Sequence, residues 1–279
     1  MPHSIPDIRS GDVAMPVIGL GTWQLEDGSA QPLVERALEL GYRHIDTAQI
    51  YGNEQDVGAA LAATGVSRAE IFLTTKVWVE HFAHGDLQRS VDESLRKLRV
   101  PQVDLLLLHW PKPRPALVET MAALNDVRDR GLTRAIGLSN FPSGLMAKAQ
   151  AASEAPIATN QVEYHPYLSQ KTLIAKARAI GASITAWSPL AQGKVAGDPV
   201  LIEIGEAHGK TPGQVTLRWQ VQQGVVTIPR TKNPTRLAEN FDIFDFALSD
   251  GEMARISALA RPDGRLGDWL DKAFEWDVE

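Results

Sequence analysis

The sequence contains no cysteine in its 279 residues, and no long hydrophobic run. Without thiols the chain forms no disulfide, thiolate nucleophile, zinc ribbon or iron–sulfur centre. The longest apolar run, around residues 103–108, ends at His109 and is far short of the roughly 20 residues that span a membrane. The opening segment, MPHSIPDIRSGD, lacks the charged and apolar regions of a signal peptide. We therefore expect a cytoplasmic protein with no membrane partner.

A basic excess is also missing, because 28 lysines and arginines stand against 34 aspartates and glutamates, a net charge of −6. A surface that binds a nucleic-acid backbone needs such an excess, so we expect no nucleic-acid partner. The 44% hydrophobic and 22% charged residues are ordinary for a globular protein and exclude a disordered or coiled-coil chain. The length suits one α/β barrel, and we expect a single domain over residues 1–279 and a monomer.

Short β-branched or leucine-rich runs alternate with helical patterns, which is typical of strand–helix–strand units in a parallel sheet. We predict eight strands at residues 17–21, 43–46, 71–76, 103–109, 133–139, 158–163, 183–187 and 225–229. Predicted helices cover residues 29–40, 54–63, 87–98, 115–130, 143–152, 171–180, 200–208 and 212–222. Glycines such as Gly41, Gly131 and Gly181 stand where left-handed helix caps are expected.

Eight consecutive units in roughly 250 residues predict an α/β fold, a single (β/α)8 TIM barrel. An N-terminal hairpin around Ser10-Gly11-Asp12 precedes it, and a short C-terminal tail, residues 261–279, follows it. An open doubly wound sheet would carry a glycine-rich phosphate loop after its first strand. The sequence GLGTWQ at residues 19–24 lacks the third glycine and no helix follows it directly, so the barrel is favoured.

Four residues with complementary chemistry follow or end predicted strands. The second strand ends at Asp46 with Tyr51 in the next loop, the third ends at Lys76, and the fourth ends at His109. Active sites of such barrels lie at the carboxyl ends of the strands, so we expect these side chains to share one cup. Each alone has a structural explanation, such as an Asp46–Lys76 ion pair inside the barrel, but the four together favour a catalytic site.

The chemistry of this set is proton donation. A tyrosine with an ordinary pKa near ~10 is a weak acid at neutral pH, but an adjacent ammonium lowers that pKa. Lys76 supplies the ammonium in this prediction, and Asp46 keeps it charged and oriented. A neutral His109 would orient a carbonyl oxygen beside the Tyr51 hydroxyl.

The tryptophans gather at the same predicted edge, since four of the seven lie within two or three residues of a strand's carboxyl end. A large apolar wall around a few polar groups is typical of a ligand pocket. Core packing inside the barrel is the alternative for any single tryptophan. The four are Trp23, Trp78, Trp110 and Trp187, and the predicted substrate contacts are Trp23, Ile50, Trp78, His109 and Trp110.

A basic run, IPRTKNPTR at residues 228–236, follows the eighth predicted strand and leads into a helix. Loops after the seventh and eighth strands of barrels recurrently bind phosphate. An ordinary basic helix start on the surface is the alternative. The position of Arg230, Lys232 and Arg236 after the last strand favours a phosphate site.

At these residues the sequence resembles the aldo-keto reductase family. The matching motifs are GYRHIDTA at 41–48, YGNE at 51–54, TK at 75–76, LHWP at 108–111, IGLSN at 136–140 and IPRT at 228–231. Within the family the sequence is most similar to short bacterial members such as the 2,5-diketo-D-gluconate reductases. The resemblance implies an NADPH-dependent oxidoreductase that reduces aldehydes and ketones to alcohols by hydride transfer, without a Rossmann domain.

The resemblance also implies residue roles. Tyr51 would be the general acid, Lys76 and Asp46 would adjust its pKa, and His109 would bind the carbonyl. Ser139, Asn140 and Gln161 would hold the nicotinamide carboxamide, Trp187 would stack on the ring, and Arg230, Thr231 and Arg236 would bind the 2′-phosphate and adenine side. The full implied set of NADPH contacts is Gly21, Thr22, Asp46, Ser139, Asn140, Gln161, Trp187, Ser188, Leu190, Gln192, Arg230, Thr231, Lys232, Arg236, Glu239 and Asn240.

The sequence departs from the larger animal members of the family in two places. The loop after His109 is very short, and the stretch after Trp187 lacks a long insertion. Both shortenings should open the substrate cup, and they leave the carbonyl substrate and the direction of the reaction open.

Three other interpretations stay open at this point. An NADP(H)-binding barrel could act as a redox sensor or regulatory subunit with little turnover. An aldolase-type barrel would use Lys76 for a Schiff base. His81 and His84 have a metal-like spacing, but a solvated loop is favoured and no metal is predicted. His165 is expected to support the rim.

Overall fold

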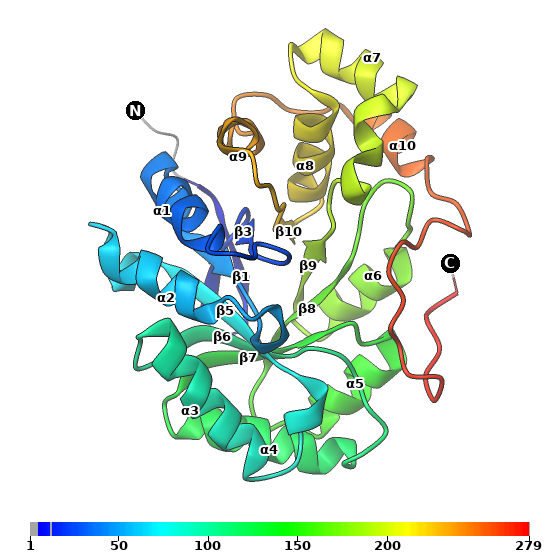
Figure 1. The fold of residues 1–279 in the computed structure, drawn as a ribbon. Helices are drawn as coiled ribbons and strands as arrows, with labels where there is room; N and C mark the ends of the chain where they lie inside the picture. The colour runs from blue at the N-terminus through cyan, green and yellow to red at the C-terminus, as the bar shows by residue number, and fades with distance from the viewer. Residues whose placement is uncertain (1–4, 12, 279) are drawn as a thin grey trace.

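A parallel sheet of eight strands forms the centre of the computed structural model, which describes residues 5–11 and 13–278. The strands pair with their neighbours in chain order, and a bridge between Ile18 and Thr227 joins the first and last of them. The sheet therefore closes on itself, and the predicted (β/α)8 barrel is confirmed (Figure 1). The strands are β3 (Leu20–Gly21), β4 (His44–Asp46), β5 (Phe72–Val77), β6 (Val103–Leu108), β7 (Thr133–Ser139), β8 (Ile157–Glu163), β9 (Ser183–Trp187) and β10 (Val225–Thr227).

Helices surround the sheet and cover its outer face (Figure 1). They are α1 (Ala30–Leu40), α2 (Glu54–Ala63), α3 (Asp86–Leu98), α4 (Leu117–Asp129), α5 (Ser143–Ala151), α6 (Lys171–Ala179), α7 (Pro199–His208), α8 (Pro212–Gln222), α9 (Pro234–Phe241) and α10 (Asp250–Ser257). The eight predicted helices match α1 to α8 within two residues at either end.

The boundaries have local causes that the sequence shows. Gly41 ends α1 in the left-handed conformation, with φ of 109°, which side chains with a Cβ rarely adopt. Thr211 begins α8 by accepting a hydrogen bond from the backbone N–H of Gln214 at 3.3 Å, and Pro212 occupies the first helical turn. Every residue of β5, β6 and β8 is buried, because helices cover the outside of the barrel and side chains fill its inside.

Two strands are shorter than predicted by two residues or more. Of the predicted range 17–21 only residues 20–21 form the regular strand β3, and of the predicted range 225–229 only residues 225–227 form β10. The remaining residues of these ranges still bond across the closure of the barrel, since the N–H of Gly21 donates to the carbonyl of Pro229 at 3.1 Å. His109 follows β6 directly instead of ending it.

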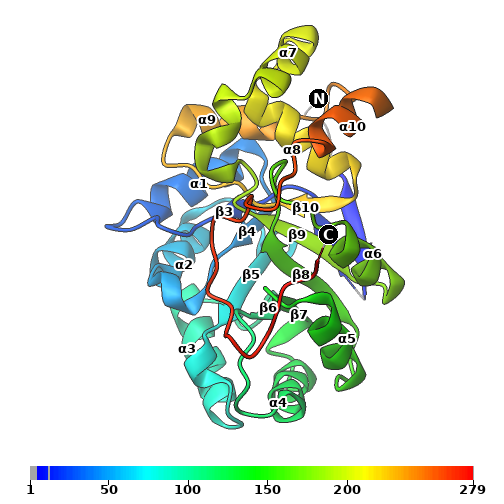
Figure 2. The same ribbon diagram turned by 90° about the vertical axis from the view of Figure 1, so that its right-hand side faces the viewer.

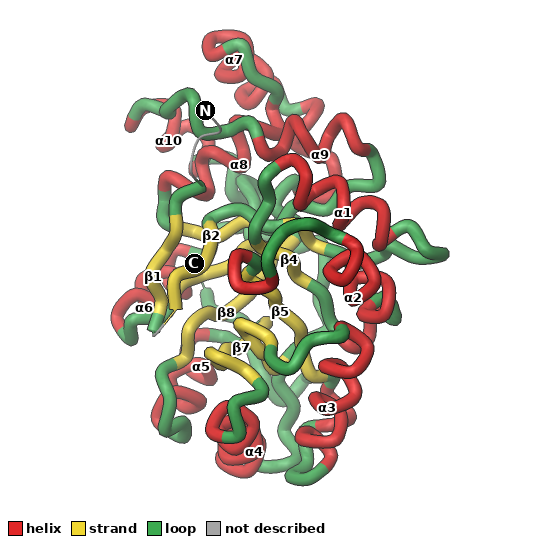
Figure 3. The backbone as a smooth tube through the Cα atoms, turned by 90° about the vertical axis from the view of Figure 1, so that its left-hand side faces the viewer, coloured by secondary structure: helices red, strands yellow, loops and turns green. Residues whose placement is uncertain are grey.

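The predicted N-terminal hairpin is confirmed as the antiparallel strands β1 (Asp7–Ser10) and β2 (Val13–Pro16), while Asp12 in its turn lies outside the described residues. The hairpin lies at the N-terminal end of the barrel, facing the viewer in Figure 3. There the Ser10 hydroxyl accepts a hydrogen bond from the backbone N–H of Ser183 at 2.7 Å. Val13 and Met15 pack with side chains inside the barrel, so the hairpin plugs this end.

The C-terminal tail, residues 261–278, contains no helix or strand. Figure 2 shows this tail, in red, crossing the opposite end of the barrel in front of the strands. Within residues 5–11 and 13–278, no helix has the length and apolar character needed to cross a bilayer.

Candidate active site

The four predicted catalytic residues meet at the C-terminal end of the barrel. Asp46 ends β4, Lys76 lies in β5, His109 follows β6, and Tyr51 ends a short 3-10 helix, η1 (Gln49–Tyr51). The Lys76 Nζ lies 2.5 Å from Asp46 Oδ1 and 3.3 Å from the Tyr51 hydroxyl oxygen. The Tyr51 and His109 rings meet edge to face, with centroids 5.6 Å apart. Parallel strands thus bring together residues that are far apart in the chain.

Lys76 is fully buried, and its ammonium has an acceptor for each of its three protons. The acceptors are Asp46 Oδ1, the Tyr51 hydroxyl and the carbonyl of Thr47, the last at 2.8 Å. The other carboxylate oxygen of Asp46 accepts from Gln161 Nε2 at 2.7 Å. Because Lys76 donates to the phenol oxygen, the phenol's own proton stays free for a substrate in the cavity.

Burial and neighbouring charges oppose each other at this cluster. Burial raises the pKa of Tyr51, and the ammonium of Lys76 offsets only part of that increase. The expected net lowering of the Tyr51 pKa is therefore wrong, because the cost of burying a phenolate is larger than the gain from Lys76. For Lys76 burial lowers the pKa, but Asp46 and Tyr51 outweigh burial, so its pKa is raised and the amine stays charged.

His109 is held neutral. Burial, with a smaller contribution from the Lys76 charge, lowers the pKa of His109 well below its ordinary value. The Trp78 ring packs edge to face against it with centroids 5.3 Å apart. Its Nδ1 is buried and has no hydrogen-bond partner among the described residues. A neutral imidazole presents one N–H donor, which suits binding of a carbonyl oxygen.

A hydrogen-bond network fixes the polar groups on the neighbouring strands. Asn140 has a positive φ of 64°, an uncommon conformation for a residue other than glycine. Its Nδ2 donates to the carbonyl of His109 at 3.0 Å, and its Oδ1 accepts from the Trp187 indole N–H at 2.8 Å. The Ser139 hydroxyl donates to the Gln161 carbonyl at 2.9 Å. The amide and the indole are therefore locked in place beside the catalytic cluster.

These groups line one cavity of about 1020 Å³. Among the predicted site residues, the cavity wall contains Gly21, Trp23, Asp46, Ile50, Tyr51, Trp78, His109, Trp110, Ser139, Asn140, Gln161, Trp187, Ser188, Leu190, Gln192, Arg230, Thr231, Lys232, Arg236 and Asn240. Three predicted residues lie outside the wall: Lys76 behind Tyr51, Glu239 on α9, and Thr22, whose carbonyl accepts from Asn53 Nδ2 at 2.8 Å.

The cations of the cavity wall come from one segment of the chain. Arg230, Lys232 and Arg236 lie in the loop after β10 and at the start of α9, and all three are exposed. No carboxylate among residues 5–11 and 13–278 forms an ion pair with any of them, and Arg230 donates a hydrogen bond to the side chain of Gln24. Unpaired cations in a concave wall suit an anionic ligand.

Another part of the cavity wall is aromatic, and it includes the tail. Trp269 packs against Trp23 and Trp110, with ring centroids 6.4 Å and 5.8 Å apart. Trp269, which is 62% exposed, and Gly267 were not predicted from the sequence. The expected opening of the cup by short loops is thus offset by the tail. Other lining residues not predicted are Gln24, Pro189, Gly193, Ile228, Pro229 and Asn233.

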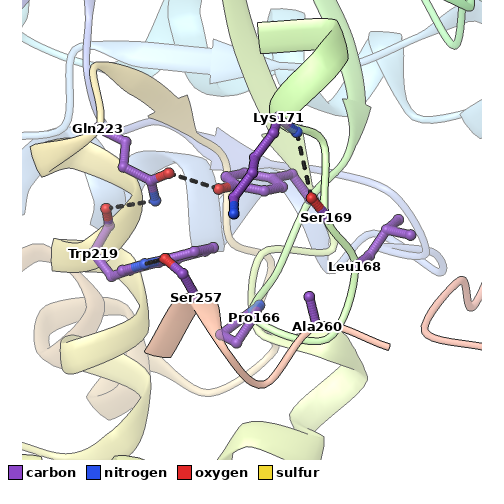
Figure 4. Close-up of a pocket in the computed structure, with 9 residues that line it drawn as sticks. Pro166, Leu168, Ser169, Lys171, Trp219, Gln223, Ser257 and Ala260 are labelled. Atoms are coloured by element: carbon purple, nitrogen blue, oxygen red, sulfur yellow. Dashed lines mark hydrogen bonds between the residues drawn. The ribbon is translucent and has the colours of Figure 1, made fainter. Parts of the chain in front are cut away.

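A second pocket lies away from these residues, beside α6, α8 and α10, and is lined by Pro166, Trp219 and Gln223 among others (Figure 4). Its volume of about 30 Å³ holds about one water molecule, far too little for a cofactor. In the part of the chain that the structure describes, no group of three or more histidine or carboxylate side chains is arranged to hold a metal ion.

Comparisons with known proteins identify the family. The model of the aldo/keto reductase family matches residues 17–261. The methylglyoxal reductase DkgB of Escherichia coli O157:H7 is 44% identical over 268 residues, which cover 95% of this chain and all of that protein.

Solved structures agree with this match. A provisionally assigned 2,5-diketo-D-gluconic acid reductase B is 50% identical, with a TM-score of 0.97 over 99% of this chain and 98% of that one. A Gox0644 variant in complex with NADPH is 38% identical, with a TM-score of 0.89 over 95% of this chain and 97% of that one. The chain belongs to the aldo/keto reductase family.

Proposed function

We propose that this protein is an NADPH-dependent reductase of aldehydes and ketones, in which Tyr51 is the general acid. The observation that carries the proposal is the arrangement of Tyr51 between Lys76 and His109 at the cavity wall. The relatives' names support it, since they include a methylglyoxal reductase and a structure in complex with NADPH.

The cavity suits a dinucleotide in size and charge. Its volume of about 1020 Å³ reaches from the catalytic cluster to the three cations of the β10–α9 segment. The backbone of Gly21 packs closely on the backbone of Ile228, because a Cβ on Gly21 would stand 2.9 Å from the Ile228 carbonyl oxygen. Arg230, Lys232 and Arg236 would hold the 2′-phosphate, since guanidinium and ammonium groups form charge-assisted hydrogen bonds to phosphate.

At the catalytic end, the fixed amide and indole side chains would hold the nicotinamide ring. Gln161 and Asn140 line the wall next to Tyr51, and the hydrogen bond to Asn140 fixes the Trp187 indole for stacking. NADPH, when bound, supplies the hydride that reduces the carbonyl carbon.

The chain's own residues supply the proton. The neutral His109 donates a hydrogen bond to the carbonyl oxygen and orients it toward Tyr51. Tyr51 keeps its proton at neutral pH because burial raises its pKa, and it gives that proton to the oxygen as negative charge develops there. Lys76 stabilises the phenolate that remains, through the hydrogen bond it already donates to the phenol oxygen.

The Schiff-base alternative is disfavoured. A nucleophilic amine must be deprotonated and accessible, but Lys76 is fully buried, donates three hydrogen bonds and has a raised pKa.

Replacing Arg236 with alanine tests the cofactor assignment. Hydrogen bonds to charged groups contribute about 1.5 to 3 kcal/mol, so the dissociation constant of NADPH should rise about tenfold or more. The dissociation constant of NADH, which has a hydroxyl at that position, should stay within about twofold. Fluorescence titration of both cofactors measures this, with Arg96→Ala, an exposed arginine on α3, as the matched control.

Turnover separates an enzyme from a sensor. We expect oxidation of NADPH when an aldehyde such as methylglyoxal is added to the unmodified protein. Tight NADPH binding without aldehyde-dependent oxidation would support the regulatory alternative, and equal affinities for NADPH and NADH would contradict the role of the three cations.

A further inference from the structure

A buried carboxylate holds the middle of the C-terminal tail. Glu163 ends β8 and is fully buried. Its Oε1 accepts a hydrogen bond from the backbone N–H of Leu266 at 2.7 Å, and its Oε2 accepts from the N–H of Gly267 at 3.0 Å. The tail has no helix or strand in which these N–H groups could pair. Glu163 therefore supplies the acceptors that regular structure supplies elsewhere.

The position of this carboxylate is itself determined by its neighbours. His165 is fully buried, and its Nε2 lies 2.8 Å from Glu163 Oε1. The Gln170 side chain donates to the Glu163 carbonyl at 2.8 Å. A buried carboxylate is costly unless hydrogen bonds satisfy it, so these contacts and the two tail amides together fix the Glu163 carboxylate in one position.

The anchored residues lie directly against the candidate active site. A Cβ on Gly267 would stand 3.0 Å from the Trp187 ring, so the tail backbone packs on the indole that would stack on the cofactor. Trp269 follows two residues later and lines the cavity with Trp23 and Trp110. The two hydrogen bonds to Glu163 thus determine where this wall stands.

The tail's other backbone anchors are farther from the wall. The N–H of Arg261 donates to the Tyr167 carbonyl at 3.1 Å, at the start of the tail. At the far end, the Asp277 carboxylate accepts from the N–H of Ser143 at 2.9 Å. Neither contact adjoins Trp269. Closer to it, the Asp271 carboxylate pairs with Lys112 at 3.6 Å, but both side chains are partly exposed, so the fully buried Glu163 is the stronger anchor.

We propose that Glu163 is a positioning residue for substrate selection, and that the wall it holds binds carbonyl compounds with a neutral aromatic body. Aromatic rings favour edge-to-face and offset contacts with other rings. The charged side chains of the cavity wall are Asp46, Arg230, Lys232 and Arg236, and none of them belongs to the tryptophan wall. A small aliphatic aldehyde has no aromatic body to pack against Trp269. This inference rests on the proposed function.

Steady-state kinetics of Glu163→Ala and Glu163→Gln with benzaldehyde and propanal test the proposal. For benzaldehyde we expect Glu163→Ala to raise KM about tenfold, and Glu163→Gln, which keeps one acceptor oxygen, to raise it less. The kcat for both aldehydes, and KM for propanal, should stay within about twofold. If Glu163 contributed to folding alone, its substitution would change the kinetic constants for both aldehydes alike.

A double-mutant cycle shows whether Glu163 acts through Trp269. Trp269→Ala removes the wall and leaves the buried carboxylate intact, so it should reproduce the effect on benzaldehyde even where Glu163→Ala folds poorly. The double variant should be no worse than either single variant. If the increases in KM for benzaldehyde caused by the two single substitutions multiplied in the double variant, the proposal would be overturned.

Asp104→Asn is the matched control, because it alters another buried carboxylate that anchors a backbone N–H, at the other end of the barrel. It should leave the ratio of kcat/KM for the two aldehydes unchanged. If the unmodified protein oxidised NADPH with neither aldehyde, the proposed function would fail. Turnover of both with equal losses in the Glu163 variants would refute only the positioning role.

Discussion

A buried charged cluster lies at each end of the barrel, and the two are built differently. At the N-terminal end, the Asp104 carboxylate accepts from the Leu73 N–H at 3.0 Å and pairs with Arg68 at 2.7 Å and Arg134 at 2.8 Å. Both arginines are partly exposed, so part of their charge stays hydrated. At the C-terminal end, Lys76 has no exposed surface, and the phenol beside it keeps a proton that no neighbour in the described part of the chain accepts.

Each of these two clusters also contains a buried nitrogen without a hydrogen-bond partner among the described residues, Arg68 Nε in the first and His109 Nδ1 in the second. A guanidinium does not lose its proton in proteins, whereas an imidazole and a phenol can exchange theirs. The first cluster can therefore only stabilise the barrel, and the second can perform acid–base chemistry. The predictions below separate these two roles.

The largest effect is expected from Tyr51→Phe. Removing the hydroxyl leaves packing unchanged but removes the proton donor, and general acid catalysis contributes about 10²-fold or more. We expect kcat to fall at least about 100-fold while the dissociation constant of NADPH stays nearly constant, since the proton moves only in the transition state. Tyr167→Phe, outside the cavity, is the control. Retention of more than about a tenth of kcat would show that another acid does the work.

A smaller loss is expected from Lys76→Met. Burial raises the pKa of Tyr51 and Lys76 partly offsets this, so removing Lys76 should raise that pKa further and weaken the acid. We expect kcat at neutral pH to fall about tenfold or more. The loss of reductase activity that occurs as pH rises through the Tyr51 pKa should move to more alkaline pH. A pH series of kcat checks both, and an unchanged profile would make Lys76 purely structural.

Asp104→Asn should lower the stability of the fold and leave catalysis nearly unchanged. Losing the charge weakens contacts to two partly exposed arginines, so we expect the free energy of unfolding to fall by about 1 to 2 kcal/mol. The kcat should stay within about twofold because no reacting atom is near. Urea denaturation and steady-state assays measure the two quantities. A large loss of kcat at full stability would show that the two ends of the barrel are coupled.

Most of the catalytic end was predictable from local pattern. Asp46, Lys76 and His109 were found because each stands where a strand ends, and parallel strands place such residues at one edge. Trp269 was not predicted, because nothing near it in sequence shows that the tail returns across the barrel. Glu163 contacts the Gly267 amide over 104 residues of chain, a pairing that no local pattern encodes.

The sequence by itself determined the order of strands and helices, the barrel, and the residues at the strand ends, because hydrophobic period, glycine caps and turn residues act over a few neighbours. Only the tertiary structure decided the balance of burial and charge on Tyr51, and the wall that Trp269 adds to the cavity. Both depend on how closely distant segments pack: desolvation follows from everything that surrounds a group, and the tail's path from hydrogen bonds to a strand more than 100 residues earlier.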